Sequence, residues 1–192
     1  MQAITLDVSA LGEVSSKQLY RLAQSNDHAH FEQTHKGELV IMLPVCSESG
    51  GFNAYITTRL FIWNEKKKLG KVFDSSTGFT LPNGATRSPD SRWIVQERWD
   101  NLTKAEKSSF APICPDFIIE LMSSSDRLKE AQDKMIEWRN NGCRLGWLID
   151  TKHENVYIYR DDGSISVLES FDEVAKGEDV LPDFELILVD LR

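Results

Sequence analysis

The stretch Cys114-Pro115-Asp116-Phe117-Ile118-Ile119-Glu120-Leu121-Met122-Ser123 decides the fold of this chain. Its short apolar run predicts a buried strand over Asp116–Met122. One charged residue, Glu120, interrupts that run. A buried carboxylate requires a cation, a proton or several hydrogen bonds. The same stretch therefore predicts a core strand and a candidate functional residue.

The segments on either side of this strand predict a mixed α/β fold with a central sheet flanked by helices. Pro89–Val95 predicts a strand before it, and Asp126–Asn140 predicts a helix after it that ends at Asn141-Gly142. The other expected elements are helices at Ser15–Ser25 and Phe52–Lys68, a short helix and a loop within Trp99–Phe110, strands at Leu39–Leu43, Val72–Phe73, Phe79–Leu81, Leu145–Asp150 and Leu186–Leu191, and a hairpin of Val156–Arg160 with Ile165–Leu168.

Composition restricts the class of protein. The chain has 192 residues, 41% hydrophobic and 27% charged, which is typical of one globular domain spanning residues 1–192. It contains neither an apolar run of about eighteen residues nor a basic, apolar N-terminal signal, so we expect no membrane partner. Three separated cysteines without a C-x-x-C pair favour a reducing, cytoplasmic location.

The net charge of −8 argues against a protein that coats DNA with a broad basic surface. It is compatible with an enzyme that contacts a few phosphates and neutralises its own carboxylates with a metal ion.

Two acidic residues predict a metal site. Asp90 follows Pro89 at the start of one predicted strand, and Glu120 lies inside another. A divalent cation between two carboxylates would balance the buried charge. Each residue also has an ordinary structural interpretation, since Asp90 could be a turn residue and Glu120 a solvent-facing strand residue.

Lys134 is the candidate cationic partner of these carboxylates. On the predicted helix it borders the inward face, one turn before Trp138. Its stem can lie along apolar surface while its ammonium reaches a carboxylate cluster, although a plain surface lysine is the alternative. In phosphodiester hydrolysis such an ammonium positions the attacking water or stabilises developing negative charge.

These residues together carry a resemblance to a known family. The segments Arg87-Ser88-Pro89-Asp90 and Cys114–Ser123, then Lys134, Asn141-Gly142 and Trp147–Asp150, resemble the Uma family of restriction endonucleases in the PD-(D/E)XK nuclease superfamily. Lys36–Met42 resembles the N-terminal Gly-Glu strand of that family. The resemblance covers roughly residues 15–190 and implies a restriction-endonuclease-like core with metal ligands on two adjacent strands.

The resemblance also implies a site. Asp90 and Glu120 match the two acids that hold Mg²⁺ or Mn²⁺. The superfamily usually has a lysine two residues after the second acid, where this chain has Met122, and Lys134 matches a lysine displaced onto the next helix. Glu38 matches an additional N-terminal acid, with Glu32 as its rival. The implied catalytic residues are Glu38, Asp90, Glu120 and Lys134.

The leading hypothesis is therefore a metal-dependent DNA endonuclease, expected as a homodimer because cutting both strands commonly needs two sites. A second hypothesis, which Met122 leaves open, is a catalytically degenerate DNA-binding or assembly protein on the same scaffold. A third is an unrelated α/β interaction protein in which an arginine such as Arg87 or Arg92 neutralises Glu120. The nuclease hypothesis requires Asp90, Glu120 and Lys134 to converge.

Overall fold

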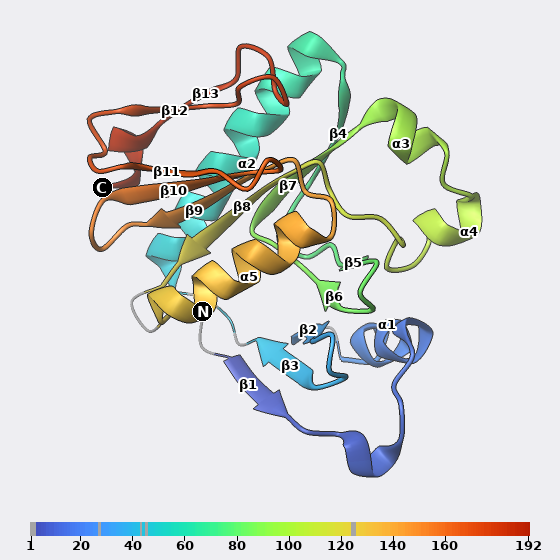
Figure 1. Ribbon diagram of the computed structural model, residues 1–192. Helices are drawn as coiled ribbons and strands as arrows, with labels where there is room; N and C mark the ends of the chain where they lie inside the picture. Colours follow the sequence, from blue (N-terminus) through green and yellow to red (C-terminus); the bar gives the residue numbers. More distant parts are fainter. Residues whose placement is uncertain (1–2, 27, 43, 45, 124–125) are drawn as a thin grey trace.

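The computed structural model describes residues 3–26, 28–42, 44, 46–123 and 126–192. A six-stranded mixed sheet lies between layers of helices (Figure 1). Its strand order is β11-β10-β9-β8-β7-β4, and only the β8–β9 pair is parallel. The strands are β4 (Gly70–Phe73), β7 (Ser91–Val95), β8 (Phe117–Met122), β9 (Leu145–Asp150), β10 (Asn155–Arg160) and β11 (Ile165–Leu168).

Helix α5 (Leu128–Asn140) connects the two parallel strands and covers one face of the sheet. Parallel neighbours require such a crossover, because the chain must return to the starting edge before the second strand. Met135 and Trp138 of α5 pack on Ile118 and Met122 of β8. Residues 118, 120 and 122 of β8 therefore share the face that α5 covers, whereas Phe117, Ile119 and Leu121 face the opposite layer.

Helix α2 (Ser47–Lys67) covers that opposite face. Its Ile56, Leu60 and Trp63 share a core with Phe117 and Ile119 of β8. The C-terminal segment closes this core with the two-stranded sheet β12 (Val174–Lys176) and β13 (Glu185–Ile187), and with the 3₁₀ helix Leu188–Leu191.

A second, antiparallel sheet lies beside the carboxyl-terminal part of β8 and the N-terminal part of α5 (Figure 1). Its order is β1-β3-β2-β6-β5, formed by β1 (Ala3–Leu6), β2 (His30–Gln33), β3 (Leu39–Met42), β5 (Phe79–Thr80) and β6 (Thr86–Arg87). This sheet contributes to the site because Glu32 of β2 and Arg87 of β6 form ion pairs with residues of α5.

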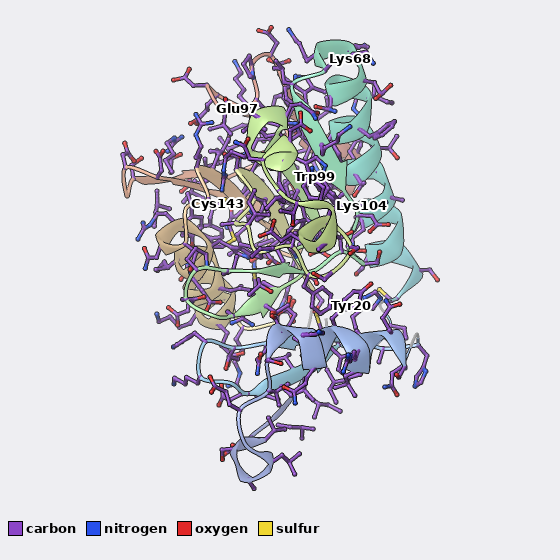
Figure 2. The ribbon with its side chains drawn as sticks, turned by 90° about the vertical axis from the view of Figure 1, so that its right-hand side faces the viewer. Tyr20, Lys68, Glu97, Trp99, Lys104 and Cys143 are labelled. Atoms are coloured by element: carbon purple, nitrogen blue, oxygen red, sulfur yellow. The ribbon has the colours of Figure 1, made fainter. Side chains whose placement is uncertain are left out.

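The remaining helices support the N-terminal sheet and its junction with the core. A 3₁₀ helix (Ser9–Leu11) precedes α1 (Ser16–Gln24), whose first turn is closed by a capping box of Ser15 and Gln18. Helices α3 (Gln96–Asp100) and α4 (Lys104–Lys107) follow β7. Tyr20 lies on the side of α1 that faces these helices (Figure 2), and its ring meets Phe110 edge-on at 5.2 Å between centroids.

The predicted fold class is confirmed, since a mixed sheet flanked by helices forms the centre of the molecule. Strand Leu145–Asp150 has the predicted bounds, whereas α2 begins at Ser47, five residues earlier than expected, and α5 begins at Leu128 rather than Asp126. Leu43, the expected last residue of one strand, lies outside the described residues.

One expected strand was wrong in part, and one observed strand was missed. The last predicted strand is extended only to Ile187 and then becomes a 3₁₀ helix, which buries both Leu188 and Leu191. Residues three apart share one side of such a helix, so the turn hides more apolar surface than an extended chain would. Strand β2 was not predicted at all. None of the helices in the described part of the chain is long and apolar enough to cross a membrane.

Candidate active site

Glu120 lies in β8 on the face that α5 covers, between Ile118 and Met122. Its Oε1 accepts a hydrogen bond from Trp138 Nε1 at 2.8 Å and lies 2.9 Å from Lys134 Nζ. Only 12% of the side chain is exposed. Burial raises the pKa of Glu120 to about 7, with Lys134 opposing this shift and the neighbouring Asp90 adding to it. Its carboxylate is therefore held at an appreciable electrostatic cost.

Asp90 lies beside Glu120, immediately before the adjacent strand β7, which begins at Ser91 rather than at the predicted Pro89. Ser91 of β7 pairs with Ile119 of β8, so Asp90 and Glu120 each lie one residue beyond that pair. The Asp90 carboxylate is buried and accepts hydrogen bonds from Leu121 N at 2.8 Å and from Asn53 Nδ2 at 2.9 Å. Burial raises the pKa of Asp90 despite these donors. The two acids thus share one buried region at the ends of neighbouring strands.

Lys134 brings a cation to this region from α5. Its Nζ lies 2.9 Å from Glu120 Oε1 and 3.2 Å from Glu32 Oε1. Burial favours the neutral amine, but the two carboxylates outweigh it and raise the pKa of Lys134. The lysine is therefore an ammonium at neutral pH, held between two acids.

Glu32 of β2 is the third acid of the cluster. Its Oε1 accepts a hydrogen bond from Ser88 N at 2.8 Å, and its Oε2 lies 3.1 Å from an Arg87 nitrogen. Burial raises its pKa, but Lys134 and Arg87 outweigh that effect and leave the pKa lowered. Glu32 is therefore a stable carboxylate that anchors the ammonium.

Glu38 does not join this cluster. It lies in the turn between β2 and β3, where its Oε2 accepts a hydrogen bond from Thr34 Oγ1 at 2.9 Å. The geometry thus selects Glu32, the rival candidate, as the N-terminal acid that contacts Lys134.

The two arginines of the third hypothesis have other partners. Arg87 lies 2.6 Å from Glu137 of α5 in addition to its contact with Glu32. Arg92 is fully buried and donates hydrogen bonds to the backbone oxygens of Pro89, Asp74 and Thr77. Glu120 forms its ion pair with Lys134 instead.

The residues present fit a divalent cation. Asp90 and Glu120 both have raised pKa values, so the nearby cations do not fully compensate their charge. Asn53 Oδ1, on the amide that contacts Asp90, is buried and has no hydrogen-bond partner in the described part of the chain. Among the described residues no group of three or more His, Cys, Asp or Glu side chains could hold a metal. Two carboxylates together with carbonyl oxygens or water are a donor set that Mg²⁺ accepts.

A family model described as Uma2, putative restriction endonuclease, matches residues 16–190. The chain belongs to the Uma2 family. The predicted resemblance is therefore confirmed, and the match includes every residue of the cluster. No curated protein sequence matches this Uma2 chain.

A solved structure supports the fold assignment of this Uma2 chain. The crystal structure of a putative nuclease belonging to DUF820 from Anabaena variabilis ATCC 29413 is similar, with a TM-score of 0.70 and 18% sequence identity. The similarity covers 84% of this chain and 88% of the other. At this level of identity it establishes a common, nuclease-like fold.

Asn53 was missed by the sequence analysis of the Uma2 chain, although it contacts Asp90 directly. In the sequence, Asn53 is a polar residue that lies between two apolar ones. Ile56 is buried in the core, and Phe52 packs against it. The polar Thr57 lies one turn further on the same side of α2, so an amide at this position does not by itself indicate a site.

Proposed function

We propose that this Uma2 protein is a Mg²⁺- or Mn²⁺-dependent endonuclease that hydrolyses phosphodiester bonds in DNA, acting in the cytoplasm as a homodimer. The observation that carries the proposal is the convergence of Asp90, Glu120 and the Lys134 ammonium in one buried cluster. Titratable groups with strongly perturbed pKa values and a specific charge partner are concentrated at functional sites. The Uma2 match and the nuclease-like fold support the same reaction class.

Asp90 and Glu120 would hold the cation, which when bound acidifies a water molecule and neutralises charge on the phosphate. Neutral donors from the protein hold these carboxylates in place: Leu121 N and Asn53 Nδ2 for Asp90, and Trp138 Nε1 for Glu120. Such outer contacts orient ligands before the ion arrives.

Lys134 would position the attacking water or stabilise negative charge on the phosphate, because an ammonium cannot coordinate a metal ion. Glu32 keeps this lysine protonated and in place, at 3.2 Å from Nζ. Arg87 in turn balances Glu32 and links it to Glu137 on α5. In this scheme the N-terminal sheet serves the reaction by presenting Glu32.

The test is a cleavage screen on DNA of varied sequence and structure, with Mg²⁺, Mn²⁺ or a chelator, for the parent and Asp90→Asn. The parent should cut only with metal, and Asp90→Asn should keep its fold while losing cleavage and Mn²⁺ binding. Equal cleavage by both proteins would contradict the proposal. Sedimentation of the parent with and without DNA checks the dimer.

Met122 favours a second candidate, a catalytically degenerate DNA-binding or assembly protein. It occupies the position of the usual lysine, is 8% exposed and packs in the core beside α5. In this candidate, the ion pairs of Lys134 only stabilise the fold, and the protein binds DNA without cutting it. Binding of DNA by the parent in the absence of any cleavage would establish this alternative.

A further inference from the structure

The two polar atoms of the Asn53 side chain differ in their hydrogen bonding. Its Nδ2 donates a hydrogen bond to Asp90 Oδ1 at 2.9 Å, and its Oδ1 is buried without a hydrogen-bond partner among the residues that the structure describes. Most buried polar atoms in proteins find a partner, and an exception calls for an explanation such as a bound ion or water. The unpartnered oxygen belongs to the same amide that touches a proposed metal ligand.

The orientation of this amide follows from its neighbours. Exchanging its oxygen and nitrogen would set Asn53 Oδ1 against Asp90 Oδ1, and two acceptors cannot form a hydrogen bond. Asp90 Oδ2 is already occupied by Leu121 N, so the contact with Asn53 fixes the other carboxylate oxygen. The free Asn53 Oδ1 is thus a fixed acceptor beside Asp90.

We propose that Asn53 is a positioning residue of the metal site: its Nδ2 holds Asp90, and its Oδ1 accepts a hydrogen bond from a water molecule on the bound cation. This inference rests on the proposed metal site at Asp90 and Glu120. Mg²⁺ usually retains several waters in protein sites, and each such water is a strong donor. Binding of the hydrated ion would then give Asn53 Oδ1 the hydrogen-bond partner that it lacks among the described residues.

The experiment measures Mn²⁺ affinity by calorimetry on the full chain, together with the electron paramagnetic resonance spectrum of the bound ion. Asn53→Leu removes both polar ends at similar size and should weaken binding by about tenfold to a hundredfold, the usual loss for a residue that supports metal ligands. Asn53→Asp keeps an oxygen acceptor and loses the donor. It should stay within about threefold of the parent affinity, because its added charge favours the cation.

Thr57→Val is the matched control. Thr57 lies one turn further along α2, and its Oγ1 is 3.4 Å from Ser91 Oγ, so it faces the same strand. This variant should bind Mn²⁺ within about twofold of the parent. A loss as large as that of Asn53→Leu would mean that any change on this helix face disturbs the site, and would overturn the inference.

The remaining outcomes separate the inference from the proposed function. If Asp90→Asn loses Mn²⁺ while Asn53→Leu binds as the parent does, the role of Asn53 fails and the metal site stands. If Asp90→Asn also binds normally, the metal site itself fails. If Asn53→Asp is as weak as Asn53→Leu, Asn53 acts only as a donor to Asp90, and the water contact is wrong. Asn53→Asp carries this test even if Asn53→Leu does not fold.

Discussion

At the scale of single residues, Glu120 couples folding to pH. Its pKa is raised to about 7 in the folded protein from an ordinary 4.5, mainly by burial. The folded state therefore keeps a proton between these values that the unfolded state releases, and the associated stability is present below about pH 4.5 and lost as pH rises through about 7. The loss is on the order of 3 kcal/mol.

Urea unfolding in a chelator at pH 5 and pH 7.5 measures this coupling. The free energy of unfolding of the parent should fall more steeply over this interval than that of Glu120→Gln, which cannot ionise. Parallel pH profiles for the two proteins would show that Glu120 does not titrate as described.

Lys134 predicts a separation between catalysis and metal binding. Lys134→Met removes an ammonium that contacts Glu120 and Glu32 but cannot itself coordinate a cation. Cleavage should fall by about a hundredfold or more, while Mn²⁺ affinity changes much less. Lys129→Met is the control, because Lys129 Nζ pairs with Asp133 on the exposed side of the same helix, at 2.5 Å. Equal activity of both variants would place the catalytic cation elsewhere.

Glu32 and Glu38 can be distinguished by stability. Glu32→Gln leaves Lys134 and Arg87 without their shared buried carboxylate, and breaking such a pair costs roughly 3–5 kcal/mol. Glu38→Gln alters a turn residue that accepts one bond from Thr34 and should cost about 0.5 kcal/mol or less. Denaturant unfolding of both variants gives the comparison, and similar losses would contradict the asymmetry.

At the scale of elements, two strand glycines differ in what surrounds them. A methyl group on Gly70 of β4 would overlap the backbone oxygen of Ile94 and the Trp93 indole, neither of which can move freely. A methyl group on Gly146 of β9 would meet the flexible end of Met135 at 2.6 Å. Gly70→Ala should therefore destabilise by about 3 kcal/mol or more, and Gly146→Ala by about 1.5 kcal/mol or less. Thermal unfolding checks the order.

The elements that were predicted well are those whose own sequence contains the reason for their conformation. Leu145–Asp150 is an apolar run buried on both faces, and a run of this kind is typical of a strand between two layers. Strand β2 (His30–Gln33) has mostly polar residues and was not recognised. Three of its four residues are buried in the folded protein, where β3, Thr86 of β6 and helix α1 surround the strand.

The same distinction explains the candidate site. Asp90, Glu120 and Lys134 could be found because each departs from the pattern of its own strand or helix. The preference for Glu38 over Glu32 relied on a short motif, whereas the contact between Glu32 and Lys134 joins residues 102 positions apart. Asn53 acquires its significance only from its distance to Asp90, which no local pattern contains.

At the scale of the whole molecule, binding of the proposed cation should increase the free energy of unfolding of the entire fold. A ligand that binds only the native state stabilises it by mass action, by about 2.7 kcal/mol at a hundredfold excess over its dissociation constant. Adding millimolar Mn²⁺ to the chelated protein should therefore raise the melting temperature, and chelation should reverse the rise. Asp90→Asn should show no such response. A parent protein that is also insensitive to metal would exclude the proposed site.

The hydrogen bond from Trp138 Nε1 to Glu120 gives the molecule a built-in optical probe. Indole emission responds to the charge and polarity next to the ring nitrogen, and here the neighbouring atom is the carboxylate oxygen that gains or loses a proton or a cation. The emission that Trp138 contributes, obtained by subtracting the spectrum of Trp138→Phe, should change as Mn²⁺ or acid is added. Occupancy of the cluster could then be followed in real time without a dye or a substrate.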